Sequence, residues 1–169
     1  MSRLSYPSRP PSSKEDWESF LRWIDGWSPA AGTWTPVLTF ATPGDLAVTY
    51  SGQYGYWYRV GDLVTVQCNI VTSAFTHTTA AGEMQVTGLP WAGMTVAGIS
   101  FDMTGAVRMR GWTNAAYTYL TSAIRGGDAY IHFVGNASGI VGADMDATDM
   151  PTGGNVAIRT TITYHANRG

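Results

Sequence analysis

Apolar and polar residues alternate along most of the chain from residue 34 onward, and this pattern predicts short β-strands separated by turns. The predicted strands span residues 34–40, 48–58, 63–72, 83–87, 95–101, 106–112, 117–125, 129–134 and 155–165. No convincing helical pattern lies between them. The sequence therefore predicts an all-β domain, an antiparallel jelly-roll-like β-sandwich.

The strongest local signal is a pair of strands joined by Gly61 and Asp62. If these two residues form a tight hairpin turn, Val60 faces Leu63 and the register of both strands is fixed. One face then pairs Arg59 with Val64, Trp57 with Val66, and Gly55 with Cys68. The other face pairs Tyr58 with Thr65, Tyr56 with Gln67, and Tyr54 with Asn69.

These two faces predict different environments. The first is mostly apolar and is expected to face the core. The second combines tyrosine rings with side-chain amides, which suits a neutral surface that contacts sugar or another subunit. The alternative is a partly covered sheet face that binds nothing.

Residues 1–31 predict an N-terminal arm and helix, separate from a β-sandwich domain over residues 32–169. Prolines at the start favour an extended arm, and Ser13 is placed to cap a helix whose N3 residue is Asp16. One apolar stripe follows, formed by Trp17, Phe20, Leu21 and Ile24. An isolated helix this short is marginally stable, so the stripe is expected to pack on its own sheet, on copies of itself or on another protein.

Composition excludes several classes of function. Charged residues make up 13% of the chain and the formal net charge is −2, with Lys14 as the single lysine, so we expect no nucleic-acid partner. No apolar stretch reaches the roughly 18 residues of a membrane span, so we expect no membrane insertion. Cys68 is the sole cysteine, which excludes an internal disulfide and suits a small core residue.

Candidate chemistry is sparse, and we expect no enzymatic activity, no cofactor and no metal. Four carboxylates directly follow glycines and are interpreted as turn residues: Asp45, Asp62, Glu83 and Asp128. The histidines, which are His77, His132 and His165, have no metal-ligand spacing. Residues 144–149 carry oxygen side chains at alternate positions, but Asp149 and Asn155 stand where a calcium loop needs Gly and Glu. The long polar segment over residues 135–154 is predicted to be a surface loop.

A resemblance rests on several short matches in one order. Gly32-Thr33-Trp34-Thr35-Pro36 opens the region, a tyrosine-rich strand and Arg59-Val60-Gly61-Asp62-Leu63-Val64 follow, and Gly88-Leu89-Pro90-Trp91 closes it. This region, residues 32 to about 90, resembles a module that recurs in bacteriophage fibre and other virion surface proteins. Such modules form homotrimers on the virion, and they bind host-surface polysaccharide or decorate the particle.

The resemblance implies two possible functions. The first is a phage virion structural protein, a short fibre or a head or tail appendage, whose β-sandwich binds host-surface glycan. The second is a capsid decoration or cement protein. The N-terminal segment would attach it to other virion proteins of the capsid, neck or tail through Trp17, Phe20, Leu21 and Ile24. The candidates for glycan binding are Tyr54, Tyr56 and Trp112.

Overall fold

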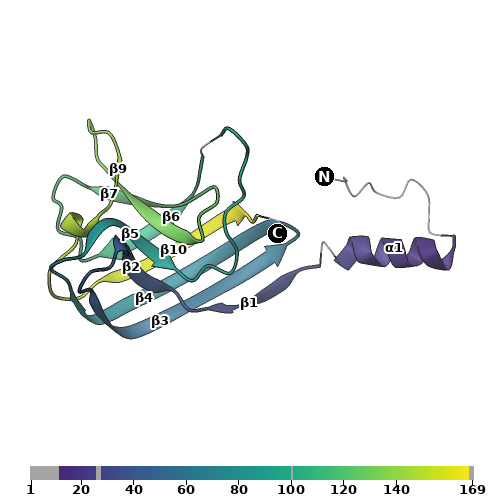
Figure 1. Ribbon diagram of the computed structural model, residues 1–169, viewed down its shortest axis with the longest axis horizontal. Helices are drawn as coiled ribbons and strands as arrows, with labels where there is room; N and C mark the ends of the chain where they lie inside the picture. Colours follow the sequence, from purple (N-terminus) through teal and green to yellow (C-terminus); the bar gives the residue numbers. More distant parts are fainter. Residues whose placement is uncertain (1–11, 26–27, 100, 168–169) are drawn as a thin grey trace.

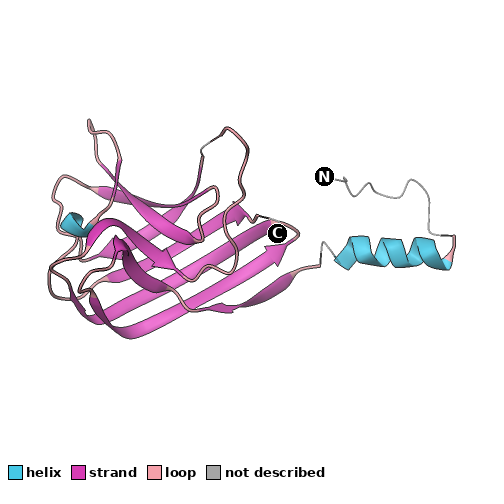
Figure 2. Cartoon of the chain, in the orientation of Figure 1, coloured by secondary structure: helices cyan, strands magenta, loops and turns pink. Residues whose placement is uncertain are grey.

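The computed structural model describes residues 12–25, 28–99 and 101–167, with the side chains of residues 22–25 left out of the description. Among these residues, ten strands form one antiparallel sheet (Figures 1 and 2). They are β1 (Ala30–Trp34), β2 (Val37–Thr42), β3 (Ala47–Val60), β4 (Leu63–Thr76), β5 (Ala81–Thr87), β6 (Asp102–Arg110), β7 (Tyr119–Arg125), β8 (Tyr130–Asn136), β9 (Ala143–Asp144) and β10 (Ala157–His165). The predicted all-β, antiparallel fold is confirmed.

The sheet is curled into a sandwich-like shape. Its strand order is β1-β3-β4-β10-β6-β7-β8-β5-β2, with β9 added beside β8. Although β1 and β2 lie at opposite ends of this order, only Thr35 and Pro36 connect them. Three extended peptide steps span at most about 11 Å, so the two ends of the sheet must lie close together. The curl packs one half of the sheet against the other, and Phe40 of β2 contacts Phe75 of β4.

The predicted hairpin register is confirmed residue by residue. Val60 faces Leu63 across the turn, and the pairs continue through Trp57 with Val66 and Tyr54 with Asn69. Gly61 adopts the positive φ, 59°, that this tight turn requires.

The inner face of the curled sheet forms the hydrophobic core. Along β10, and along β4 from Val64 to Thr72, every second side chain is buried, which is the strand period expected for a sheet covered on one face. Trp34 anchors the β1 end of the core, where its indole N–H donates to the carbonyl of Gln67 at 3.2 Å. The largest fully buried side chains are Tyr164, Phe40, Phe75, Phe133, Leu38, Ile70, Met84, Ile124, Ile131, Met145, Ile158 and Ile162.

Two strand predictions are wrong. Of the predicted strand over residues 95–101, the described residues 95–99 and 101 form no strand: Val96 and Ile99 make one isolated bridge around Gly98, whose positive φ reverses the chain, and the Ile99 side chain is 61% exposed. Residues 34–40 divide into β1 and β2 around Pro36, because proline has no N–H to donate to a sheet.

The segment after β8 also differs from its prediction as a polar surface loop. It adds β9 and a short 3₁₀-helix, η1 (Ala147–Asp149), and it buries Met145 and Met150 in the core. Asp146 and Asp149 cap η1 reciprocally through backbone N–H groups. Residues 144–149 therefore fold as a core-packed cap rather than as a solvated loop.

The helix α1 (Lys14–Asp25) begins as predicted, since Ser13 accepts a hydrogen bond from the Asp16 N–H at 3.0 Å. On its apolar stripe, Trp17 and Leu21 are 50% and 54% exposed, and the Trp17 ring packs edge-on to Phe20. The Ile24 side chain lies outside the described residues. In Figure 1 the helix is drawn apart from the sheet and covers neither of its faces. None of the described helices is long and apolar enough to cross a membrane.

Gly55 provides a test of the packing at the β1 end of the core. A Cβ added at Gly55 would overlap the indole of Trp34. We expect Gly55→Ala to lower the free energy of unfolding by about 2 kcal/mol, measured by chemical denaturation, because it overpacks this part of the core. Gly153→Ala is the matched control, since its Cβ meets open space, and it should change stability by less than about 0.5 kcal/mol. Equal effects of the two substitutions would contradict this account of the packing.

Candidate functional site

The outer face of the sheet carries rows of polar side chains that cross four strands. In one row, Tyr54 of β3 pairs with Asn69 of β4, which pairs with Arg159 of β10, which pairs with Arg108 of β6. The adjacent row runs through Tyr56, Gln67, Thr161 and Ala106. Residues at matching positions of neighbouring strands point to the same side, so each row forms a continuous strip of surface.

These two rows form a groove of about 510 Å³, called here the outer-face groove. It is lined by Tyr54, Gln67, Cys68, Asn69, Ala106, Val107, Arg108, Arg159, Thr160 and Thr161. Ala106 and Thr161 are small, whereas Tyr54, Arg108 and Arg159 are long, and this difference in size hollows the surface. The volume falls in the range of small-molecule sites, about 300–1,000 Å³.

The sequence predicts a neutral surface here, but the groove is positively charged. Arg108 and Arg159 lie directly opposite each other in the register of β6 and β10, and both are exposed. The Nε of Arg159 donates to the side-chain oxygen of Asn69 at 2.9 Å. Among the described residues, no ion pair joins either arginine to a carboxylate.

The predicted glycan-binding residues fall in different places. Tyr54 lines the groove, and its side chain is 52% exposed. Tyr56 belongs to the adjacent row but does not line the groove, and its ring packs edge-on to Tyr58 at 4.7 Å between centroids. A hydrogen bond with Tyr58 is the main reason that the pKa of Tyr56 is raised. Trp112 lies apart, partly buried against the hydrophobic core.

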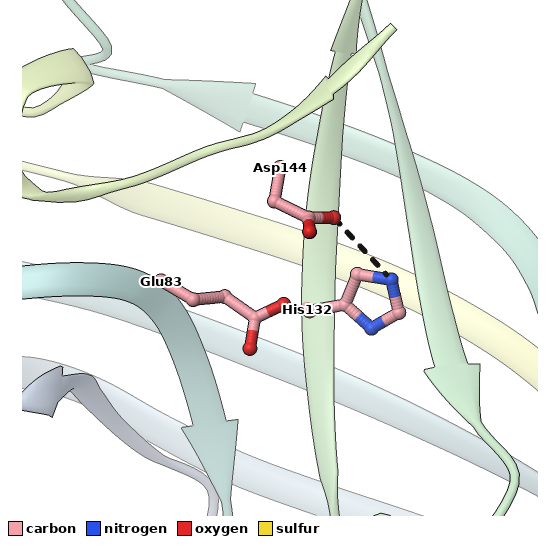
Figure 3. A group of neighbouring side chains, drawn as sticks. All are labelled: Glu83, His132 and Asp144. Atoms are coloured by element: carbon pink, nitrogen blue, oxygen red, sulfur yellow. Dashed lines mark ion pairs between the residues drawn. The ribbon is translucent and has the colours of Figure 1, made fainter.

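A second polar group, called here the His132 cluster, contains Glu83, His132 and Asp144 (Figure 3) together with Asp102 and with Arg125 of β7. His132 of β8 is fully buried, and neither ring nitrogen has a hydrogen-bond partner within the described part of the chain. Its Nε2 lies 3.7 Å from Asp102 Oδ2 and 3.8 Å from Asp144 Oδ1, which is beyond hydrogen-bond length. Glu83 of β5 completes the cluster.

Arg125 holds the carboxylates of this cluster together. Its guanidinium contacts Glu83 at 2.6 Å, Asp144 at 2.5 Å and Asp102 at 3.7 Å. Burial alone would lower the pKa of Arg125, but the hydrogen bonds and the charges of Glu83 and Asp144 outweigh it and raise that pKa. Glu83 therefore is not the turn residue that the preceding glycine had indicated. It lies in β5 and connects that strand to β7.

The three side chains drawn in Figure 3 have the donor types of a metal site. The ligand atoms of Glu83, His132 and Asp144 lie within 4.8 Å of one another. However, Arg125 already bonds one oxygen of each carboxylate and supplies positive charge there. We therefore interpret the His132 cluster as an ion-pair brace that fixes β9 against β5 and β7.

The sequence patterns indicated neither the arginines of the groove as binding residues nor the His132 cluster. The alternation along β10 did place Arg159 and Thr161 on a polar face. No local signal shows which strands border β10, because its partners are distant in the sequence. Arg159 pairs with Asn69 of β4, 90 positions away, and with Arg108 of β6, 51 positions away.

Comparison with known proteins identifies a structural relative. No protein-family model matches the chain, and no curated protein matches its sequence. Among solved structures, the crystal structure of the Dettilon tailspike protein aligns with a TM-score of 0.51 and 14% sequence identity. The alignment covers 79% of this chain and 23% of the tailspike chain. The chain thus shares its fold with about a quarter of that protein.

The brace formed by Arg125 can be tested through stability. Arg125→Leu leaves Glu83, Asp102 and Asp144 close together without their countercharge. We expect a loss of about 2 kcal/mol in the free energy of unfolding, less than for a fully buried pair because the cluster is partly exposed. Arg110→Leu is the control, since the exposed Arg110 has no ion pair among the described residues. Chemical denaturation of both variants gives the comparison, and a loss as small as that of the control would contradict the brace.

Proposed function

We propose that this protein is a bacteriophage virion surface module that binds a host-surface glycan in the outer-face groove without cleaving it. The observation that carries the proposal is the groove itself, in which the exposed Tyr54 ring stands beside the amides of Gln67 and Asn69. A tyrosine ring offers an apolar surface for a sugar ring, and amides supply hydrogen bonds to hydroxyl groups.

Two independent lines support a phage surface role. The motifs of residues 32 to about 90 resemble virion surface modules, and the fold resembles part of a phage tailspike protein. A fold alone does not define a function, so the ligand is argued from the groove and the phage context from the combined resemblance.

We further propose that the chain assembles as a homotrimer and attaches to the virion through its N-terminal segment. The tip of the β3–β4 hairpin exposes Tyr58, Val60 and Leu63, an apolar group that suits contact with another subunit. The half-exposed Trp17 and Leu21 of α1 offer a second apolar surface, which suits a partner virion protein.

The alternative function is decoration of the capsid without receptor binding. The same exposed apolar groups favour it, because a cement protein needs extensive contacts with its neighbours. The two functions differ in what they require of the groove. Glycan binding requires Tyr54 to contact the ligand, whereas decoration leaves the groove without a role.

Substitution of Tyr54 tests glycan binding. On an array of bacterial surface polysaccharides, we expect the protein to bind at least one polysaccharide and to leave its chain length unchanged on size-exclusion chromatography. Tyr54→Ala should weaken that binding by about 1–2 kcal/mol, because it removes the stacking ring, with little change in melting temperature.

Tyr119→Ala is the matched control, since Tyr119 is similarly exposed but does not line the groove. It should bind as the unaltered protein does. Absence of binding to every polysaccharide would refute the proposed receptor and favour decoration. A large loss of stability in Tyr54→Ala would instead assign that ring to an interface or the core.

Truncation tests the N-terminal segment. Because β1 begins at Ala30, residues 28–169 retain all the strands that the structure describes. We expect this fragment to fold and to sediment as a trimer at micromolar concentration, yet to be absent from purified particles, because it lacks the apolar stripe of α1.

The double substitution Trp17→Ser with Leu21→Ser in the full chain is the companion variant, and it should also fail to enter particles. Normal incorporation of either form would exclude attachment through α1. A monomeric fragment would exclude a trimer held by the β domain.

A further inference from the structure

We infer that the ligand of the outer-face groove is an acidic glycan, one that carries carboxylate groups on its sugar rings. This inference rests on the proposed glycan binding and adds the chemical class of the ligand. It comes from the two arginines that the curled sheet places in the groove beside Tyr54.

Arg108 and Arg159 form a like-charge pair across two strands. They are directly opposite in the antiparallel register of β6 and β10, and both line the groove. Like charges at directly opposite positions destabilise a sheet, so this arrangement has a cost in the protein alone. A bound anion between the two guanidinium groups would offset that cost.

The protein itself supplies no such anion among the described residues. Every ion pair described for an arginine involves Arg125, which meets three carboxylates in the His132 cluster. The Nε of Arg159 donates a hydrogen bond to the side-chain oxygen of Asn69 at 2.9 Å, and this contact orients the guanidinium. Its two terminal amino groups make no hydrogen bond among the described residues, so both remain available to a ligand.

The row of side chains defines how such a ligand lies. Tyr54 occupies one end of the row and Arg108 the other, with Asn69 and Arg159 between them. A glycan with one sugar ring stacked on Tyr54 therefore extends along the row, and its next rings reach the two guanidinium groups. A planar carboxylate matches the fork of an arginine, and such charge-assisted hydrogen bonds are stronger than neutral ones.

The experiment compares acidic and neutral polysaccharides on the same array of bacterial surface polysaccharides. We expect binding to be confined to acidic ones. The bound polysaccharide is then treated to reduce its carboxyl groups to primary alcohols, which removes the charge and keeps the sugar backbone. Affinity for the reduced form should fall at least about tenfold, and raising NaCl from about 0.05 to 0.5 M should weaken binding to the untreated form.

Three variants assign the effect to residues. Arg108→Gln and Arg159→Gln should each lower affinity about tenfold, the loss of one charge-assisted hydrogen bond. Neither should lower the melting temperature, because each relieves the repulsion within the pair. Arg110→Gln is the matched control: Arg110 is exposed two residues along the same strand and does not line the groove, so its affinity should stay within about twofold.

The outcomes separate this inference from the function on which it rests. Binding that is confined to neutral polysaccharides, or that survives carboxyl reduction unchanged, would overturn the acidic ligand and leave glycan binding intact. Unchanged affinity in Arg108→Gln and Arg159→Gln would also overturn it. No binding to any polysaccharide would refute the proposed function and the inference with it.

Discussion

The register of the β3–β4 hairpin is the constraint on which the rest of the structure depends. A slip of one residue in either strand would send every side chain of that strand to the opposite face. The turn at Gly61 and Asp62 prevents this slip, because Gly61 adopts the positive φ that the tight turn needs. As a result Val64 and Val66 enter the core, while Tyr54 and Asn69 face outward and form one side of the groove.

The arginines on the outer face of the sheet have two contrasting charge environments. Arg125 lies among Glu83, Asp102 and Asp144, so its charge is compensated and the group braces neighbouring strands. Arg108 and Arg159 face each other without a carboxylate among the described residues. Paired charges within a protein stabilise or position its parts, whereas an uncompensated pair in a groove is available to a ligand. This contrast separates a structural cluster from a binding surface.

The curled sheet forms the base of the groove. The dipeptide Thr35-Pro36 joins strands from opposite ends of the sheet, so the sheet has to curl. Met145 and Met150 of the segment after β8 are buried in the core that the curled sheet encloses. The groove is thus built on four hydrogen-bonded strands, a base that holds its side chains more precisely than loops would.

The sequence by itself determined the local features. Alternation predicted most of the strands, the Gly61-Asp62 turn predicted the hairpin register, and Ser13 with Asp16 predicted the start of α1. Each of these signals involves residues close along the chain. The tyrosine and amide side of the groove could be predicted for the same reason, since β3 and β4 are joined by two residues.

Only the tertiary structure decided which distant strands are neighbours. Arg108 and Arg159 meet because β10 lies between β4 and β6, and Glu83, His132 and Asp144 meet because β5, β8 and β9 pair side by side. The buried Met145 and Met150 likewise lie in a segment that reads as polar. The partners in these contacts are set by burial of the whole apolar surface, a non-directional force that leaves no signature in a short stretch of sequence.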